Sequence, residues 1–594
     1  MSDTIYAQIT PPGRASTSII RVSGRKSQFI ISELVEMVDD VLRNPRQLIY
    51  TKIFDLLESS LGQLPNLEAT SDNQEHAQTS TDSQDLHTDS TPRHSRNILD
   101  FALVVYFAAP NSFTGEACIE FHVHGSPIIV ARLMENLQAL GCRLAEPGEF
   151  SKRAFLNGRM DLVQAESVAD LITAETEAQR KSATEQLHGR LKNVLSDIGD
   201  PLRDVLAEIE ANIDFPEEEI PPFSLVEWQK KAETVCEKVD FYLQSYQTGK
   251  IYREGVSVVL AGKPNAGKSS LLNMLVGEDR AIVTPQAGTT RDTIEEHISL
   301  NGFCVKLSDT AGVVENVGTN IQPRNISEPE RLGVARSWDK IKSADMVLYL
   351  LDCEAIEQDI ADFMQRGQLA KDTDDNNSKD VDLQAQIKSS VWMSENGSSY
   401  KESFRDDLLI LDKIKPICSQ VLLVFAKADL IQDARLKFNL ELIFADENKI
   451  FISSKLNYGI LELRERIYGE LIGNRLGGGV YIANKRHYDA LSDARNDLDA
   501  VVHIIKKLIS ANNGNNTQVL DSVAGGLDYG RVGALISRAN LHRQTKLRQS
   551  GAEASMDLIS IELRSALGRL EEIVGVTSNE DLLGRIFSKF CIGK

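Results

Sequence analysis

Residues 262–269 read Gly-Lys-Pro-Asn-Ala-Gly-Lys-Ser and stand between two apolar stretches of different period. The run Val256 to Leu260 predicts a strand, and the spacing from Leu271 to Leu275 predicts a helix. Glycines at both ends of such a loop let its N–H groups face phosphate oxygens, while its lysine reaches the outer phosphates and its serine can ligate Mg²⁺. An ordinary glycine-rich loop would lack the flanking strand and helix, so the string predicts an α/β phosphate-binding domain.

A second strand and a short loop supply further parts of a nucleotide site. The apolar alternation from Phe303 to Leu307 leads into Asp-Thr-Ala-Gly at 309–312, which would bring an aspartate beside the metal and a glycine N–H beside the γ-phosphate. Thr290, in the Gly-Thr-Thr-Arg-Asp string at 288–292, is placed to complete the Mg²⁺ shell with Ser269. Together these segments predict a nucleoside triphosphatase.

The preference for guanine should come from residues 426–429, Ala-Lys-Ala-Asp, which follow a strand at 421–425. The carboxylate of Asp429 can accept both N–H groups of the guanine edge, whereas adenine offers no such pair. Ala426 replaces the asparagine usual at this point, so we expect weakened but unaltered base preference. Ser453-Ser454-Lys455, after another apolar run, resembles the last guanine-contacting loop.

The chain departs from Ras-like enzymes in how hydrolysis is driven. Val313 stands where a glutamine would position the attacking water, and Arg291 is as readily a solvated loop residue as an arginine finger. Asn265 suggests a monovalent cation, held by its amide oxygen and by backbone carbonyls of the first switch, that would neutralise phosphate charge. The alternative is that Asn265 only stabilises the turn.

Longer strings resemble a known family. GKPNAGKSSLLN at 262–273 with GTTRD at 288–292 is similar to GTPases of the Era, Der and MnmE (TrmE) families. The MnmE family is selected by AQITPPGR at 7–14, IRVSG at 20–24, NSFTGE at 111–116, PGEFSKRAFLN at 147–157 and the C-terminal DLLGRIFSKFCIGK at 581–594. The resemblance covers nearly the full length, apart from two inserts.

This resemblance implies a potassium-stimulated GTPase whose guanine domains pair across a homodimer. K⁺ would be bound by Asn265, Thr284, Gln286 and Thr289. Glu330 would orient the hydrolytic water; from sequence alone a surface carboxylate is the simpler interpretation. The predicted GTP contacts are Asn265, Ala266, Gly267, Lys268, Ser269, Ser270, Thr284, Pro285, Gln286, Ala287, Gly288, Thr289, Thr290, Asp309, Thr310, Ala311, Gly312, Lys427, Asp429, Ser453, Ser454 and Lys455.

The resemblance also implies a bound tetrahydrofolate that carries a one-carbon unit, as a 5-formyl or 5,10-methylene derivative. The matching residues are Arg21, Glu120, Arg159 and Lys594, with Arg159 in place of an expected lysine. Without the family, Glu120 would be interpreted as a solvent-facing strand residue. Cys591 is a catalytic nucleophile or general acid/base near the target uridine, or a packing thiol.

Size, charge and cysteines limit the class of protein. The 594 residues suffice for several domains, and no run of eighteen apolar residues or basic-then-apolar N-terminus appears, so we expect a cytoplasmic chain without a membrane anchor. Seven scattered cysteines without a CxxC pair indicate neither a disulfide framework nor a zinc site. The net charge of −21 argues against a broad nucleic-acid surface, so tRNA contact would use local basic patches.

Periodicity divides the chain. We predict an α+β domain at 1–157, with strands from Ile5, Ser18, Leu103 and Cys118, an amphipathic stretch at 127–140 and an acidic insert near 58–97. The resemblance implies that this domain binds folate and dimerises. A helical bundle domain would comprise 158–252 and 474–594, interrupted by the Ras-like P-loop GTPase domain at 253–473, which has its own acidic insert near 354–407.

Two functions follow. We prefer a GTPase that works with the flavoprotein MnmG, as a heterotetramer, to add a carboxymethylaminomethyl or aminomethyl group to C5 of the wobble uridine (position 34) of certain tRNAs. The other is a switch in ribosome assembly, as in Era-like and Der-like proteins. Era-like chains carry a C-terminal KH module and Der-like chains two guanine domains, and neither pattern is visible.

Overall fold

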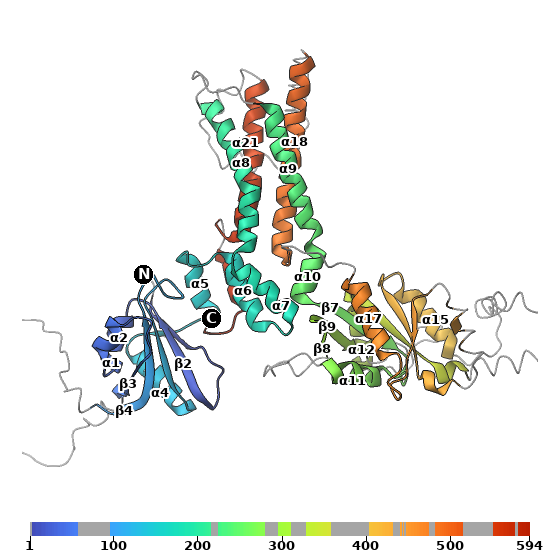
Figure 1. The fold of residues 1–594 in the computed structure, drawn as a ribbon, viewed down its shortest axis with the longest axis horizontal. Coiled ribbons are helices and arrows are strands. Elements are labelled where there is room, and N and C mark those ends of the chain that lie inside the picture. Colours follow the sequence, from blue (N-terminus) through green and yellow to red (C-terminus); the bar gives the residue numbers. More distant parts are fainter. Residues whose placement is uncertain are drawn as a thin grey trace, which may run out of the picture. The chain divides into compact units, whose positions relative to one another are not determined.

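The computed structural model describes residues 3–57, 96–214, 224–279, 295–310, 328–357, 403–431, 437, 440–441, 444, 447–473, 482–514, 551–576 and 580–593. The chain forms two compact units (Figure 1). Unit 1 combines Met1–Ala169 with Glu571–Lys594, and unit 2 is Asp170–Leu570. Unit 1 is therefore made from both ends of the chain, with unit 2 inserted between them.

A six-stranded sheet in the order β3-β4-β5-β2-β1-β6 forms the centre of unit 1. All neighbours are antiparallel except β1 and β6, which are parallel. In the register between β2 and β5, Arg21 lies opposite Glu120. The strands are β1 Ile5–Gln8, β2 Ala15–Ser23, β3 Ile49–Phe54, β4 Ile98–Phe107, β5 Cys118–Gly125 and β6 Arg143–Leu144.

Helices pack on this sheet because alternate strand residues and one stripe of each helix are apolar. Ile20, Val104 and Phe121 on the strands are fully buried against Ile30 and Leu133 on the helices. A smaller cluster packs Leu583 and Phe587 of the last helix, and Phe590 just after it, against Leu162 and Ala165. The helices are α1 Ser27–Leu34, α2 Val38–Arg43, α4 Pro127–Ala139, α5 Glu149–Leu156, α6 Leu162–Thr173 and α22 Glu580–Phe587.

Long helices form one part of unit 2. In Figure 1, α8, α9, α18 and α21 run side by side as a bundle. Trp228 of α9 is fully buried and its indole N–H donates to Glu208 of α8 at 2.6 Å. Arg495 of α18 donates twice to Asp240 of α9. The helices are α7 Glu177–Leu187, α8 Arg190–Asp214, α9 Leu225–Gln244, α10 Tyr246–Glu254, α18 Lys485–Gly514 and α21 Gly551–Val574.

The other part of unit 2 is a twisted sheet in the order β12-β11-β10-β7-β9-β8. Every neighbouring pair is parallel except the antiparallel hairpin β8–β9. Loops that follow parallel strands meet at one edge of a sheet, which is where ligands bind in such folds. The strands are β7 Val256–Gly262, β8 Glu295–Leu300, β9 Phe303–Asp309, β10 Met346–Asp352, β11 Val421–Ala426 and β12 Lys449–Phe451.

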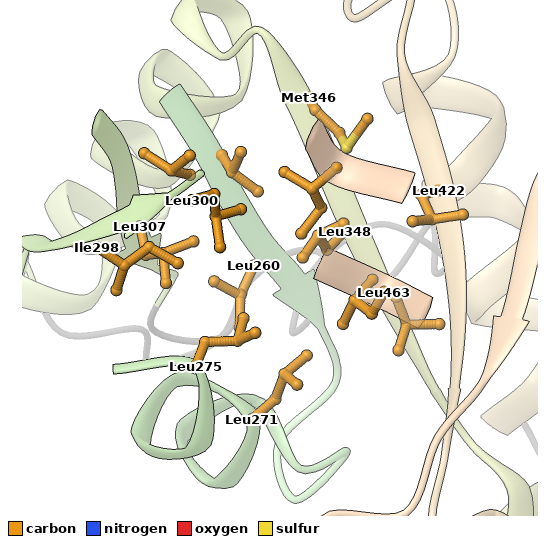
Figure 2. Packing of buried hydrophobic residues seen from close by; sticks show 14 of the residues in the cluster. Leu260, Leu271, Leu275, Ile298, Leu300, Leu307, Met346, Leu348, Leu422 and Leu463 are labelled. Atoms are coloured by element: carbon orange, nitrogen blue, oxygen red, sulfur yellow. The ribbon is translucent and has the colours of Figure 1, made fainter. Parts of the chain in front are cut away.

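Helices cover both faces of this sheet, so its central strands are apolar throughout. Figure 2 shows one face, where Leu271 of α11 and Leu463 of α17 pack against strand residues such as Leu260 and Leu348. The opposite face is covered by α12 and α15, through Ile341 and Ile410 among others. The elements are α11 Lys268–Asp279, α12 Glu328–Ser343, α15 Ser403–Ile414, η2 Ala428–Leu430 and α17 Ile460–Leu471.

The predicted fold class is confirmed: an α+β N-terminal part, a helical bundle and an α/β P-loop domain. The boundaries between the four predicted segments remain predictions. Among the described residues, no helix is both long and apolar enough to cross a membrane.

Candidate nucleotide site

The predicted phosphate loop follows the central strand β7 and leads into α11. Gly262 has φ 142°, Asn265 φ 65° and Gly267 φ 98°, so the loop turns through backbone conformations that glycine and asparagine tolerate. A Cβ added at Gly262 would lie 2.6 Å from the Leu350 carbonyl oxygen of β10. The glycine therefore serves close strand packing as well as the turn.

The P-loop lysine is folded back onto its own loop. Lys268 is buried, and its ammonium donates to the carbonyl oxygens of Gly262 at 2.9 Å and Lys263 at 2.7 Å. Burial lowers the pKa of Lys268, and the nearby Asp309 carboxylate opposes that shift. The oxygens of a bound phosphate group would offer this ammonium negatively charged acceptors, which would stabilise its charged form.

The structure brings Ser269, at the start of α11, next to Asp309, at the end of β9. The Ser269 hydroxyl donates to Asp309 Oδ2 at 3.1 Å, and Asp309 Oδ1 is buried without a hydrogen-bond partner. Thr310 is anchored next to it, with its hydroxyl donating to the Leu260 carbonyl at 2.8 Å. A hydroxyl beside an unsatisfied carboxylate oxygen is an oxygen donor set of the kind Mg²⁺ prefers, so these residues fit the predicted metal.

The predicted base-recognition loops also meet. Ser453 donates from its hydroxyl to Asp429 Oδ1 at 2.6 Å, and the Ala428 N–H donates to the Ile452 carbonyl. Lys427 adopts φ 57°, and its ammonium lies 2.7 Å from Asp352 Oδ2 at the end of β10. The hydrogen bond to Asp352 raises the pKa of Lys427. Ser454 and Lys455 continue the turn after Ser453.

Ala426 lies directly behind the P-loop. A Cβ added at Gly267 would lie 3.8 Å from the Ala426 Cβ. An asparagine amide at this position could hydrogen-bond the loop backbone, whereas the alanine methyl makes only van der Waals contact. Ala426 thus contacts the P-loop through its methyl group, and the weakened base preference stays a prediction.

Sequence reasoning missed a polar contact that holds the P-loop from the other side. Lys263 lies 3.1 Å from Asp407 of α15, whose Oδ1 accepts a hydrogen bond from the Tyr349 hydroxyl at 2.8 Å. We call these three residues the P-loop brace. Burial raises the pKa of Asp407, and Lys263 and Tyr349 partly oppose the shift. The three positions are far apart in sequence, so no short sequence motif predicts that they are in contact.

Part of the predicted site lies outside the described residues: Thr284, Pro285, Gln286, Ala287, Gly288, Thr289, Thr290, Ala311, Gly312 and Lys594. Glu330 belongs to the first turn of α12, but its side chain is likewise not described. Ala266 is buried and Ser270 is exposed on the first turn of α11.

The predicted folate residues lie in unit 1. Arg21 donates to Glu120 Oε1 at 2.9 Å, and its guanidinium stacks 5.1 Å from the centroid of Phe113. Burial opposes ionisation of Glu120, but the His122 ring 3.5 Å away and the charge of Arg21 outweigh it, so the pKa of Glu120 is lowered. Glu120 is thus a half-buried, paired carboxylate and not the freely solvated residue that the strand pattern alone predicts.

Arg159 and Cys591, two further predicted site residues, are both exposed. Arg159 is exposed, and its Cγ would lie 3.1 Å from a Cβ added at Gly115, two residues beyond Phe113. Cys591 is exposed, and its carbonyl accepts a bond from the Gly148 N–H at 3.4 Å. Among the cysteines of the described segments, the other six are buried, as expected for packing thiols.

A P-loop after the central strand, a serine–aspartate pair at the metal position and an aspartate-bearing base loop define the second unit as carrying a P-loop GTPase fold. The chain belongs to the MnmE (TrmE) family: the MnmE helical domain matches residues 162–591, and the N-terminus of the GTP-binding protein TrmE matches residues 4–159.

Whole-length relatives agree with this assignment. A tRNA modification GTPase MnmE of Aquifex aeolicus is 34% identical over 497 residues, covering 84% of this chain and 87% of the relative. Another from Erwinia tasmaniensis is 32% identical and covers 100% of this chain and 99% of the relative. A crystal structure of Aquifex aeolicus Era with GDP and aluminium fluoride matches 41% of this chain and 67% of the Era chain at 20% identity, with a TM-score of 0.24.

Proposed function

We propose that this chain hydrolyses GTP and uses the cycle to modify tRNA. The observation that carries the proposal is the buried, unpartnered Oδ1 of Asp309 beside the Ser269 hydroxyl, at the mouth of a P-loop whose companion loop presents Asp429. Its MnmE relatives are named tRNA modification GTPases, which supports both halves of the proposal.

In this site, Mg²⁺ would be bound by Ser269 and Asp309, with Thr290 completing the shell. When bound, the ion neutralises charge on the phosphates. Lys268 would exchange its carbonyl partners for phosphate oxygens, and Asp429 would select guanine. A K⁺ ion held by Asn265, Thr284, Gln286 and Thr289 would supply the charge that other GTPases take from an arginine finger, and Glu330 would orient water.

The test is hydrolysis of GTP and of ATP by the full-length protein in matched KCl and NaCl. We expect GTP to be preferred and KCl to accelerate its hydrolysis. Asn265→Gly keeps a residue that tolerates the positive φ and removes the side-chain amide. Its rate of GTP hydrolysis in KCl should be at least about tenfold below that of wild type, while it should still bind GDP. Equal rates with either nucleotide or either salt would refute this proposal.

The second half of the proposal concerns tRNA. The paired Arg21 and Glu120 beside Phe113 provide a cation, a carboxylate and an aromatic face, which suit the donor-rich pterin and the acidic tail of a tetrahydrofolate. With MnmG as the flavoprotein partner, the folate would supply the one-carbon unit for C5 of uridine 34. A homodimer in the cytoplasm is the assembly we propose.

Wobble-uridine modification should be measured in cells that lack this protein. Loss of the carboxymethylaminomethyl or aminomethyl group, restored by the intact chain but not by Glu120→Ala, is the expected outcome. Normal modification together with defective ribosomal subunits would favour the assembly switch instead.

A further inference from the structure

Three side chains that no part of the nucleotide site uses gather beside the β8–β9 hairpin. These are Glu175, His297 and Cys304, and one ligand atom from each lies within 4.8 Å of the other two. His297 Nδ1 and Glu175 Oε2 are 2.5 Å apart. Cys304 is buried, while the other two are half-buried, so the cluster has one side open to solvent. We call it the hairpin cluster.

The fold fixes each member of the hairpin cluster independently. His297 of β8 and Cys304 of β9 belong to one antiparallel register, in which Cys304 lies opposite Ser299 and therefore diagonal to His297 on the same face of the sheet. The Cys304 Cβ also lies against Gly255, where an added Cβ would approach to 2.8 Å. The two ligands on the sheet are thus held by the backbone, without help from a loop.

Glu175 reaches this face because the start of α7 is anchored to the hairpin. Thr176 and Gln179 form a reciprocal cap, and the Gln179 side-chain oxygen also accepts from the Glu175 N–H at 2.9 Å. The Ala178 N–H donates to the Gly302 carbonyl in the β8–β9 turn at 3.1 Å. These bonds join the segment that precedes the bundle to the GTPase domain, within one unit of the structure.

The chemistry of the donors selects the ligand. One thiol, one imidazole and one carboxylate form a mixed sulfur, nitrogen and oxygen set that suits Zn²⁺ or Co²⁺, whereas Mg²⁺ and K⁺ prefer oxygen alone. Zinc bonds of about 2.0 to 2.3 Å place tetrahedral ligand atoms roughly 3.3 to 3.8 Å apart. The three side chains therefore need only small rotations to reach these separations around a metal ion. A water molecule from the open side would be the fourth ligand.

We propose that the hairpin cluster binds a single Zn²⁺-class transition-metal ion and so fastens the start of α7 to the strand that ends at Asp309. On binding, Cys304 gives its thiol proton to solvent, and the neutral imidazole of His297 keeps its one N–H proton on the ring nitrogen that does not bind the metal. The thiolate, the other imidazole nitrogen and the carboxylate then each donate a lone pair to the metal, and any second imidazole proton is released to solvent. The proposal does not depend on the nucleotide site, because none of its ligands belongs to it.

Cobalt is the probe, because a thiolate–Co²⁺ bond absorbs in the near ultraviolet and a tetrahedral site adds strong visible bands. Full-length protein, freed of metal by chelation and saturated with Mg²⁺ and GDP, should bind one Co²⁺ per chain with both signals. Added Zn²⁺ should abolish them. Absence of the thiolate signal in the wild-type protein would overturn the proposal.

Variants locate the site. Cys304→Ser should abolish the thiolate signal, and Glu175→Gln and His297→Gln should each weaken Co²⁺ binding by at least about tenfold. Matched controls are Cys418→Ser, a buried thiol of the same domain, and His188→Gln, next to the end of α7; both should bind like wild type. If Cys304→Ser does not fold, the Co²⁺ affinities of Glu175→Gln and His297→Gln test the proposal instead. A thiolate signal that survives in folded Cys304→Ser, or unchanged affinity in both half-buried variants, contradicts the assignment.

Discussion

At the scale of single residues, Asp407 of the P-loop brace should make the stability of the GTPase domain fall as pH rises from the acid side. Burial raises its pKa above the ordinary value of 3.8, so the folded chain holds this proton more tightly than the unfolded chain. Ionisation above pH 3.8 therefore costs folding free energy until the pH exceeds the raised pKa. Asp407→Asn removes this titration, so the stability of the variant relative to wild type should increase as pH rises.

Hydrogen exchange of the β7 and β10 amides, followed by mass spectrometry across that pH range, reports opening of this domain alone. Asp412→Asn is the matched control, because Asp412 is exposed on the same helix α15. Its difference from wild type should not change with pH. If the stability of Asp407→Asn relative to wild type instead decreased with rising pH, Lys263 would lower the pKa of this carboxyl overall.

The site residues show what single positions in a sequence can reveal. Lys268, Ser269 and Asp309 were predictable because each stands in a short string whose backbone conformation and chemistry are coupled. The P-loop brace and the hairpin cluster were not, because their members come from strands, a helix and loops that are far apart in sequence and meet only in the folded chain. The cysteine spacing indicated no zinc site, yet Cys304 meets His297 across a hairpin and Glu175 from far upstream.

At the scale of elements, the junction between α5 and the C-terminal segment depends on a glycine. Gly148 caps α5 with φ 68°, and a Cβ there would lie 2.6 Å from the Phe587 carbonyl oxygen and 3.1 Å from the Phe590 Cβ. Gly148→Ala adds a backbone clash to the strain of the left-handed conformation. We expect it to destabilise unit 1 by about 2 to 5 kcal/mol, measured by thermal unfolding.

Gly158→Ala is the control, since Gly158 also has φ 68° but has no atom within 4 Å of the added Cβ. This variant carries the conformational strain alone and should cost only about 1 to 2 kcal/mol. Equal losses in the two alanine variants would show that α22 does not pack against the start of α5 in solution.

Elements with strong periodicity were predicted well and short ones were not. The stretch predicted at 127–140 is α4, Pro127–Ala139, and strands predicted from Leu103 and Cys118 belong to β4 and β5. The edge strand β3 was missed, because its outward residue Tyr50 is exposed and blurs the alternation. Helices α1 and α2 are too short, at 8 and 6 residues, for a helical period to register against the neighbouring strands.

At the scale of the whole molecule, the two ends of the chain share one unit, while the described core of the GTPase domain uses no residue from either end. Among the described residues, the buried members of the apolar cores on the two faces of its sheet lie between Ile251 and Ile472, and Ala178 of α7 packs against one of these cores. Unit 1 instead buries Leu583, Phe587 and Phe590 from the far end of the chain. Loss of the C-terminus should therefore weaken unit 1 and leave nucleotide binding intact.

A chain that ends at Val576 tests this division, because it keeps α21 and removes α22. Each of the three lost apolar side chains contributes about 1.5 to 3 kcal/mol by burial, so unit 1 should lose roughly 4 to 9 kcal/mol, comparable to the whole stability of a domain. Calorimetry should show its transition lowered or absent. GDP at about 100 times its Kd should still stabilise the GTPase domain by about 2.7 kcal/mol. A chain that ends at Phe590 retains all three side chains and should keep both transitions, and if it unfolds like the shorter chain, the last residues and not the α22 core hold unit 1 together.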